Sequence, residues 1–136
     1  MVRTLIIDDE LHIRDTLGIM LERFCPEVEV VGMASGVESG VQAIRESDPE
    51  LVLLDIHMGD GTGFELLHAL APIHFHVIFI SAMDRNTIRA FKLSGMEYVL
   101  KPVSPVELKM AIDRVMKAEM ADFGLQLQAL EGNVGL

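Results

Sequence analysis

The stretch Val2-Arg3-Thr4-Leu5-Ile6-Ile7-Asp8-Asp9-Glu10 decides the fold, because a strand-length apolar run ends abruptly in three acidic residues. The run is rich in β-branched residues, which favour strands. Its nearly continuous apolarity is typical of a strand buried on both faces of a parallel sheet. Carboxylates directly after such a strand lie at the carboxyl end of the sheet, where open α/β proteins bind their ligands. The stretch therefore predicts both the kind of sheet and the place of its chemistry.

Four further apolar runs follow, and the segments between them carry apolar residues at helical spacing. The runs are Val28 to Met33, Leu51 to Leu54, Phe75 to Ile80 and Tyr98 to Leu100. The second run alternates as Val28-Glu29-Val30, which places it at a sheet edge. Ser104 is expected to cap the last helix, with Pro105 at its first position. We expect an α/β, flavodoxin-like doubly wound (βα)5 fold with a five-stranded parallel sheet in the order 2-1-3-4-5.

The length and composition of the chain predict a single acidic domain. The chain has 136 residues, of which 50% are hydrophobic, enough for a single compact core. The formal net charge is −10, and residues 1–60 hold 13 acidic side chains against 4 basic ones. Phosphate contacts need a basic face, so we expect this domain itself to bind no nucleic acid. The single cysteine excludes an internal disulfide and a cysteine-rich zinc site.

The hydropathy pattern predicts a soluble intracellular protein with no membrane partner. No apolar run approaches the roughly 18 residues that cross a bilayer. The N-terminal stretch MVRTLIIDDE turns acidic after seven residues, unlike a signal peptide.

The residues that follow the apolar runs carry the chemistry, because parallel strands deliver their carboxyl ends to one crevice. The first run is followed by Asp8 and Asp9, the third by Asp55, the fourth by Ser81 and the fifth by Lys101. Clustered carboxylates repel one another unless a cation lies among them. Oxygen ligands suit Mg²⁺, and an aspartate beside Mg²⁺ is a competent nucleophile towards phosphorus. A lysine and a hydroxyl would hold the transferred group, so the pattern predicts phosphoryl chemistry.

Four motifs, in this order, resemble those of the receiver domain of a two-component response regulator. They are Ile6-Ile7-Asp8-Asp9-Glu10, Leu53-Leu54-Asp55-Ile56-His57-Met58, Ile80-Ser81-Ala82 and Tyr98-Val99-Leu100-Lys101-Pro102. The resemblance covers residues 2–120. The stretch DIHMGDGTGFELL at 55–67 resembles receivers attached to LytTR-type DNA-binding domains, although Gly59 stands where proline is usual.

The resemblance implies a metal site and a phosphoacceptor. Asp8, Asp9 and Asp55 would bind Mg²⁺ together with the backbone carbonyl of His57. Asp55 would accept a phosphoryl group from a sensor histidine kinase. Lys101 would neutralise the charge of that group. These roles describe a regulatory phosphoacceptor domain of a bacterial cytoplasmic protein, and not an enzyme.

The resemblance also implies a switch. Ser81 would hold the phosphoryl group with Lys101 and move towards it, and Tyr98 would then turn into the vacated space. The face formed by the fourth helix, the fifth strand and the fifth helix would change and support a homodimer on phosphorylation. A cis peptide is implied before Pro102.

Residues 1–120 are expected to form the receiver domain, and 121–136 a C-terminal extension or a linker to an absent output domain. An apolar stripe continues through this part of the chain, although Gly124 would weaken a helix there. Its members are Met116, Met120, Phe123, Leu127 and Leu130. The sequence leaves open a frayed or docked extension, a helical linker and a dimer seam.

Two other functions compete with this interpretation. A protein-interaction module of receiver fold that is read without phosphorylation is the main alternative. The triplet Asp60-Gly61-Thr62 is similar to one in haloacid-dehalogenase-type phosphatases, but that motif needs an aspartate where Met58 stands.

Overall fold

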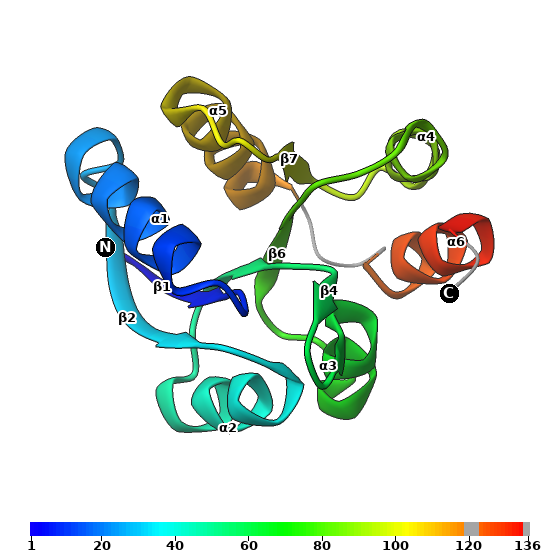
Figure 1. Ribbon diagram of the computed structural model, residues 1–136, viewed down its shortest axis with the longest axis horizontal. Helices are drawn as coiled ribbons and strands as arrows, with labels where there is room; N and C mark the ends of the chain where they lie inside the picture. Colours follow the sequence, from blue (N-terminus) through cyan, green and yellow to red (C-terminus); the bar gives the residue numbers. More distant parts are fainter. Residues whose placement is uncertain (119–122, 135–136) are drawn as a thin grey trace.

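A parallel five-stranded sheet in the order β2-β1-β3-β6-β7 forms the centre of the molecule (Figure 1). The computed structural model describes residues 1–118 and 123–134. The strands are β1 (Val2–Ile7), β2 (Val28–Ala34), β3 (Leu51–Leu54), β6 (His76–Ser81) and β7 (Tyr98–Leu100). Two-residue strands β4 (His57–Met58) and β5 (Gly61–Thr62) pair as a separate antiparallel hairpin. The predicted strand order and the edge position of the second strand are confirmed.

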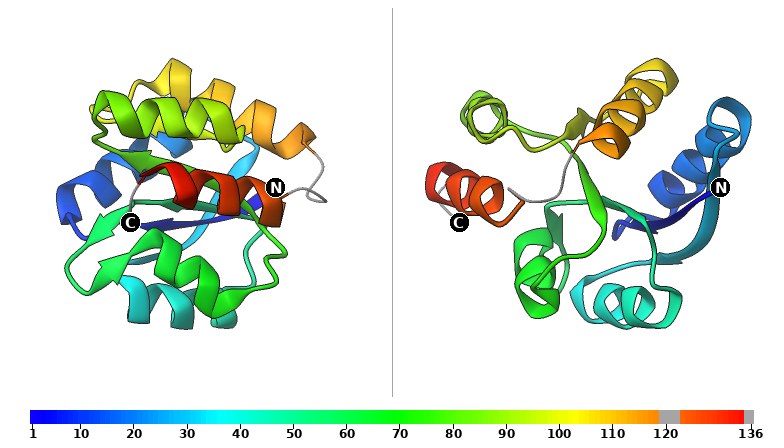
Figure 2. Two further views of the ribbon diagram at one scale, coloured as in Figure 1. Left: turned by 90° about the vertical axis from the view of Figure 1, so that its right-hand side faces the viewer. Right: turned by 180° about the vertical axis from the view of Figure 1, so that it is seen from behind.

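Helices cover both faces of the sheet and enclose two hydrophobic cores. On one face lie α1 (Leu11–Phe24) and α5 (Pro105–Lys117). On the other lie α2 (Val37–Ser47), α3 (Gly63–Leu70) and α4 (Arg85–Ser94). A further helix, α6 (Phe123–Val134), packs along α4 on that second face (Figure 2). None of the helices in the described part of the chain is long and apolar enough to span a membrane.

Local sequence explains where the helices start and stop. The Ser104 side chain accepts a hydrogen bond from the Glu107 amide and Pro105 opens α5, as predicted. Asp84 caps α4 by accepting from the Thr87 amide. Gly95 ends α4 with φ of 75°, a left-handed conformation that glycine adopts without steric cost.

The structure adds features that hydrophobic periodicity did not predict. The β4–β5 hairpin is too short to show any period. The strand expected from Phe75 to Ile80 is shifted by one residue, so that Ser81 belongs to β6. The expected cis peptide between Lys101 and Pro102 is present, and a second one joins Ala71 to Pro72.

The C-terminal stripe continues as α6, whose apolar side chains join the core beneath α3 and α4. Leu127 and Leu130 are buried there, and Phe123 is partly buried against the same cluster. Gly124 lies inside the helix. Met120, which was expected to belong to the stripe, lies outside the described residues. Of the arrangements that the sequence left open, the structure shows a docked one.

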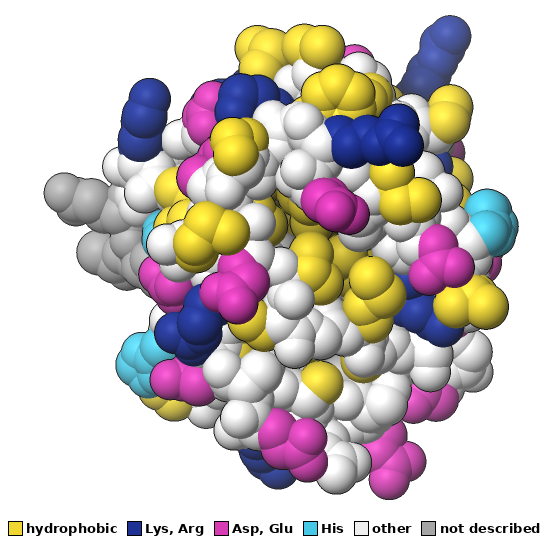
Figure 3. Space-filling model, turned by 90° about the vertical axis from the view of Figure 1, so that its left-hand side faces the viewer, with side chains coloured by type: hydrophobic (Ala, Val, Ile, Leu, Met, Phe, Trp, Pro, Cys, Tyr) yellow, Lys and Arg dark blue, Asp and Glu magenta, His cyan; other side chains and the backbone are white. Residues whose placement is uncertain are grey.

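An apolar hollow lies between α1 and the edge strand β2 (Figure 3). Its lining includes Ile19, Val30 and Met33, with Asp15 and Glu29 also bordering it. The acidic side chains on this face are exposed, so part of the charge excess of the first 60 residues is solvated surface.

Candidate functional site

The carboxyl ends of four neighbouring strands bring the predicted site residues together. Asp8 follows β1, Asp55 follows β3, Ser81 ends β6 and Lys101 follows β7. Asp8 is 1% exposed and Asp55 is 4% exposed, which is unusual for carboxylates, and Ser81 is buried beside them. Asp9, next in the chain, is exposed. The site is thus a mostly buried acidic pair with one solvent-facing neighbour.

Backbone hydrogen bonds hold the two buried aspartates at the sheet end. The Asp55 amide donates to the Ile7 carbonyl and the Asp8 amide donates to the Ala34 carbonyl. These bonds extend the strand ladders by one residue, so both side chains leave the sheet at the same level. The position of each carboxylate therefore follows from strand register.

The Lys101 ammonium lies between the two buried carboxylates. Its Nζ donates to Asp55 Oδ2 at 3.2 Å and lies 2.9 Å from Asp8 Oδ2. The contact with Asp8 is an ion pair, and the other Asp8 oxygen, Oδ1, accepts a hydrogen bond from the Glu10 amide at 2.9 Å. Lys101 itself is positioned by its amide, which donates to the Ser81 carbonyl. One positive charge is shared between two negative ones.

Burial and charge shift the pKa values of this group in opposite directions. Burial raises the pKa of Asp55, the Ser81 hydroxyl lowers it, the neighbouring Asp8 raises it and Lys101 lowers it, with an upward net shift. Burial lowers the pKa of Lys101, but Asp8 and Asp55 outweigh burial and raise it overall. Lys101 therefore stays charged, while the ionised form of Asp55 is destabilised.

The oxygen donors beside this pair fit a divalent cation. Carboxylate oxygens of Asp8, Asp9 and Glu10 lie within 4.8 Å of one another. Such a hard oxygen set matches the ligand preference of Mg²⁺. Asp55, which is also predicted to be a ligand, lies outside this cluster of three, and its carboxylate contacts Lys101.

The loop after Asp55 is held by residues for which the sequence predicted no role. The Gly63 amide donates to the Ile56 carbonyl, and a Cβ on Gly63 would lie 2.6 Å from the Asp55 carbonyl oxygen. Thr62 caps α3 by accepting from the Glu65 amide. The glycine-rich spacing of residues 59–63 was the available signal, but it does not say which backbone groups come close.

Asp60 ties this loop to a second helix. Its carboxylate accepts hydrogen bonds from the amides of Val37 and Glu38, at 2.8 and 3.1 Å, and thereby caps α2. These bonds lower the pKa of Asp60. A Cβ on Gly36 would lie 2.6 Å from Asp60 Oδ1, so only glycine fits there without displacement. The Asp60-Gly61-Thr62 triplet thus serves two helix caps.

His57 and Tyr98 lie at the border of the site. His57 belongs to β4, two residues past Asp55, and its side chain is exposed. Tyr98 is half-buried, and its ring centroid is 5.3 Å from that of Phe91. The aromatic contacts continue from Phe91 to Phe79 at 5.2 Å and from Phe79 to Phe64 at 5.3 Å. Tyr98 is therefore the outermost member of a row of four rings.

The fold and the site define a class of signalling domain: a flavodoxin-like α/β receiver with acidic residues and a lysine at its strand ends. The sequence profile of the response regulator receiver domain matches residues 4–113. The chain belongs to this family of two-component receiver domains.

Similar proteins agree with this assignment. The chain is 41% identical over 118 residues to a response regulatory protein of Vibrio parahaemolyticus, covering 86% of this chain and 48% of that protein. It is 32% identical over 123 residues to the sensory transduction protein LytT of Bacillus cereus, and the match covers 89% of this chain and 50% of LytT. The receiver domain of the response regulator NarL from Mycobacterium tuberculosis superposes with a TM-score of 0.73 at 25% identity, covering 86% and 98%. The chain spans about half the length of the two curated relatives.

Asp55→Asn is expected to raise the thermal unfolding midpoint at pH 7 in EDTA, because it removes a buried carboxylate while Lys101 keeps Asp8 as a partner. The raised pKa means that the folded state binds this proton more tightly than the unfolded chain does. Ionisation of Asp55 therefore destabilises the folded protein increasingly as the pH rises above 3.8, the ordinary pKa of an aspartate. The difference in unfolding midpoint between Asp55→Asn and the unchanged protein should shrink as the pH falls towards 3.8. Calorimetry between pH 7 and pH 3.8 measures the difference in unfolding midpoint between the variant and the unchanged protein. Asp113→Asn, at an exposed position, is the control. A midpoint at pH 7 that is unchanged or lowered would contradict the expectation.

Gly63→Ala is expected to destabilise the protein by about 1–3 kcal/mol, the usual range for overpacking a filled site. The added methyl would press on the Asp55 carbonyl oxygen and on the Leu54 side chain. Denaturant unfolding measures the change. Gly59→Ala is the matched control in the same loop, because no atom lies within 4 Å of the place that its Cβ would take. Equal stability of the two variants would contradict the expectation that the close contact of Gly63 with the Asp55 carbonyl excludes a larger side chain.

Proposed function

We propose that this receiver accepts a phosphoryl group on Asp55 from a sensor histidine kinase. The observation that carries the proposal is the Lys101 ammonium, which lies within reach of the buried Asp55 and Asp8 carboxylates. A buried carboxylate beside a fixed positive charge is suited to receiving a group whose transferred oxygens are negative. Membership of the receiver family supports the same assignment.

Asp55, Lys101 and Ser81 would each have a separate role in the transfer. An Asp55 oxygen forms a bond to phosphorus while the phosphorus–nitrogen bond of the donor phosphohistidine breaks and the imidazole leaves. Lys101 neutralises negative charge on the transferred oxygens, and the Ser81 hydroxyl donates a hydrogen bond to one of them. The domain thus assists its own phosphorylation and dephosphorylation, and it acts on no other substrate as an enzyme.

Asp8 and Asp9 would hold Mg²⁺, completed by Asp55 and the His57 backbone carbonyl, with Glu10 close by. The ion would supply positive charge opposite the phosphoryl oxygens. Asp8, Asp9 and Glu10 each offer a carboxylate oxygen to such an ion, and these oxygens lie within 4.8 Å of one another.

Phosphorylation would be read out through Ser81 and Tyr98. Movement of Ser81 towards the phosphoryl group would vacate space for the Tyr98 ring and change the face of α4, β7 and α5, supporting a homodimer. The likeness to LytT, which is about twice as long, fits a cytoplasmic bacterial regulator with a DNA-binding output domain of the LytTR type outside this sequence. Residues 1–120 would be the receiver and 121–136 the extension or linker to that output.

Incubation with acetyl phosphate and Mg²⁺ is expected to add the mass of one phosphoryl group to the intact chain. EDTA should abolish the addition, and Asp55→Asn should not be modified. Lys101→Ala should slow it by about 10-fold or more, because a charge aimed at the transferred group is lost. Lys117→Ala, an exposed lysine at the end of α5, is the control.

A modification that persists in Asp55→Asn would refute Asp55 as the acceptor. A chain that takes up no phosphoryl group under these conditions would instead favour an interaction module that is read without phosphorylation.

A further inference from the structure

Helix α6 lies between α3 and α4, as the side view of the molecule shows (left panel of Figure 2), and its inner side packs into the groove that these two helices form. Leu130 is 0% exposed and Leu127 is 7% exposed. Both belong to the hydrophobic cluster that contains Phe64 of α3 and Phe91 of α4. The inner face of α6 therefore completes a core that α3 and α4 leave open between them.

Polar contacts attach α6 to both walls of the groove. His68 Nε2 on α3 lies 2.7 and 2.9 Å from the two carboxylate oxygens of Glu131. On the other wall, a Cβ on Gly95 at the end of α4 would lie only 3.2 Å from Gln126 Nε2, so α6 approaches this turn closely. The position of α6 is specific, and it depends on where α4 lies.

Helix α6 has little stability of its own. It is 12 residues long and contains Gly124 and Gly132. Isolated helices of this length are marginal in water, and glycine disfavours the helical state further. Leu125, on its outer side, is 69% exposed and contributes little burial. The helix thus owes its structure to its packing in the groove, so loss of that packing would also unfold it.

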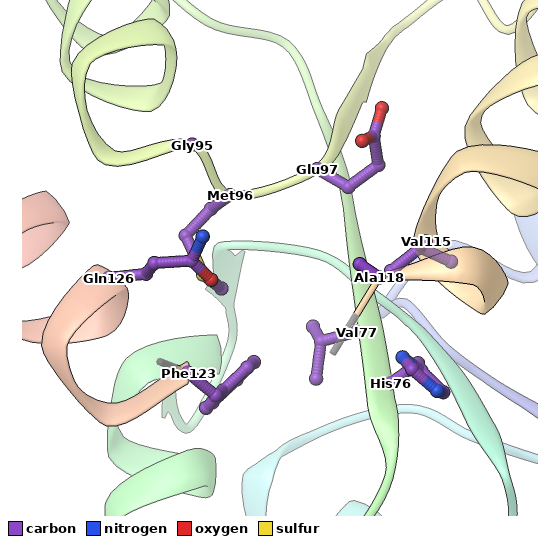
Figure 4. A pocket seen from close by; sticks show the side chains of 9 residues that line it. All are labelled: His76, Val77, Gly95, Met96, Glu97, Val115, Ala118, Phe123 and Gln126. Atoms are coloured by element: carbon purple, nitrogen blue, oxygen red, sulfur yellow. The ribbon is translucent and has the colours of Figure 1, made fainter. Parts of the chain in front are cut away.

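The groove is also incompletely filled where α6 begins. A small cavity there is lined by Phe123 and Gln126 of α6 and, on the opposite side, by Val77, Met96 and Val115 (Figure 4). Phe123 is only partly buried. A loosely packed end is the natural starting point for detachment, since fewer contacts must be broken there.

Phe91 of α4, which belongs to the core cluster under α6, also lies next to Tyr98, the predicted switch residue. Phe91 contacts α6's core cluster on one side and the Tyr98 ring, at a centroid distance of 5.3 Å, on the other. Ser81 pairs with Leu100 in the sheet, two residues from Tyr98. A rearrangement of Ser81 and Tyr98 therefore acts on Phe91 and on the α4 wall that holds α6.

We propose that the α3–α4 groove is a helix-binding surface occupied by α6 in the unphosphorylated chain, and that phosphorylation of Asp55 releases α6 from it. The inference rests on the proposed function, since it concerns the regulation of the same site. Release would uncover the apolar groove and free residues 123–134 from it. By linkage, docked α6 opposes occupancy of the Asp55 site to the same extent.

Hydrogen exchange of the full chain, with the intact mass of the same sample recorded in parallel, tests the release. With acetyl phosphate and Mg²⁺, amides of residues 123–134 are expected to exchange faster, while those of β1 are unchanged. A chain that carries the phosphoryl group but keeps the same exchange in α6 overturns the inference alone. A chain that takes up no phosphoryl group refutes the proposed function and the inference with it.

Variants of α6 test the reciprocal effect. Leu130→Ala should weaken docking and lower the beryllofluoride concentration for half-saturation, measured by calorimetry with Mg²⁺, by about fivefold or more, the lower end of typical couplings. Leu125→Ala, on the same helix but exposed, should leave it unchanged. Should Leu130→Ala unfold, Glu131→Gln provides a milder loss of the His68 contact with a smaller shift in the same direction. An unshifted midpoint in a folded docking variant, or an equal shift in Leu125→Ala, overturns the coupling.

Discussion

One ammonium group placed between two buried carboxylates is the constraint on which the rest of the structure depends. Asp8 and Asp55 lose hydration at the end of the sheet, and the Lys101 ammonium contacts both carboxylates there. Breaking such a group by removing the cation would leave uncompensated buried charge, which is strongly destabilising. The geometry of the strand ends, the turn after β7 and the loop after β3 all serve to hold these three side chains at contact distance.

The site holds two buried carboxylates but only one ammonium group among the described residues, so it carries a net negative charge. This charge favours the binding of a cation. The Lys101 ammonium faces both the Asp8 and the Asp55 carboxylates, and burial raises the pKa of Asp55. A divalent cation at the acidic cluster and a phosphoryl group on Asp55 would each redistribute this charge. Stability is lowered at the place where ligands act, as is common for functional sites. The central strands β3 and β6 compensate, because nearly all of their side chains are buried.

The site does not end at the sheet. A row of four aromatic rings runs from Tyr98 to Phe64 and forms part of the core on which α6 lies. Packed aromatic rings transmit displacement because a close-packed interior has little free volume. The helix at the far side is short, contains glycines and borders a cavity. The row of rings and α6 therefore belong to one hydrophobic core.

The sequence by itself determined the strand order, the edge position of β2 and the residues that meet at the strand ends, because hydrophobic period and strand-end chemistry are local properties. The sequence also predicted the N-terminal cap of α5 at Ser104. Only the tertiary structure decided that Lys101 contacts both Asp8 and Asp55, that Asp60 caps α2 across 23 residues of sequence, and that α6 docks between α3 and α4. These contacts join segments distant in the chain, and their geometry depends on how the helices pack on the sheet, which no local pattern encodes.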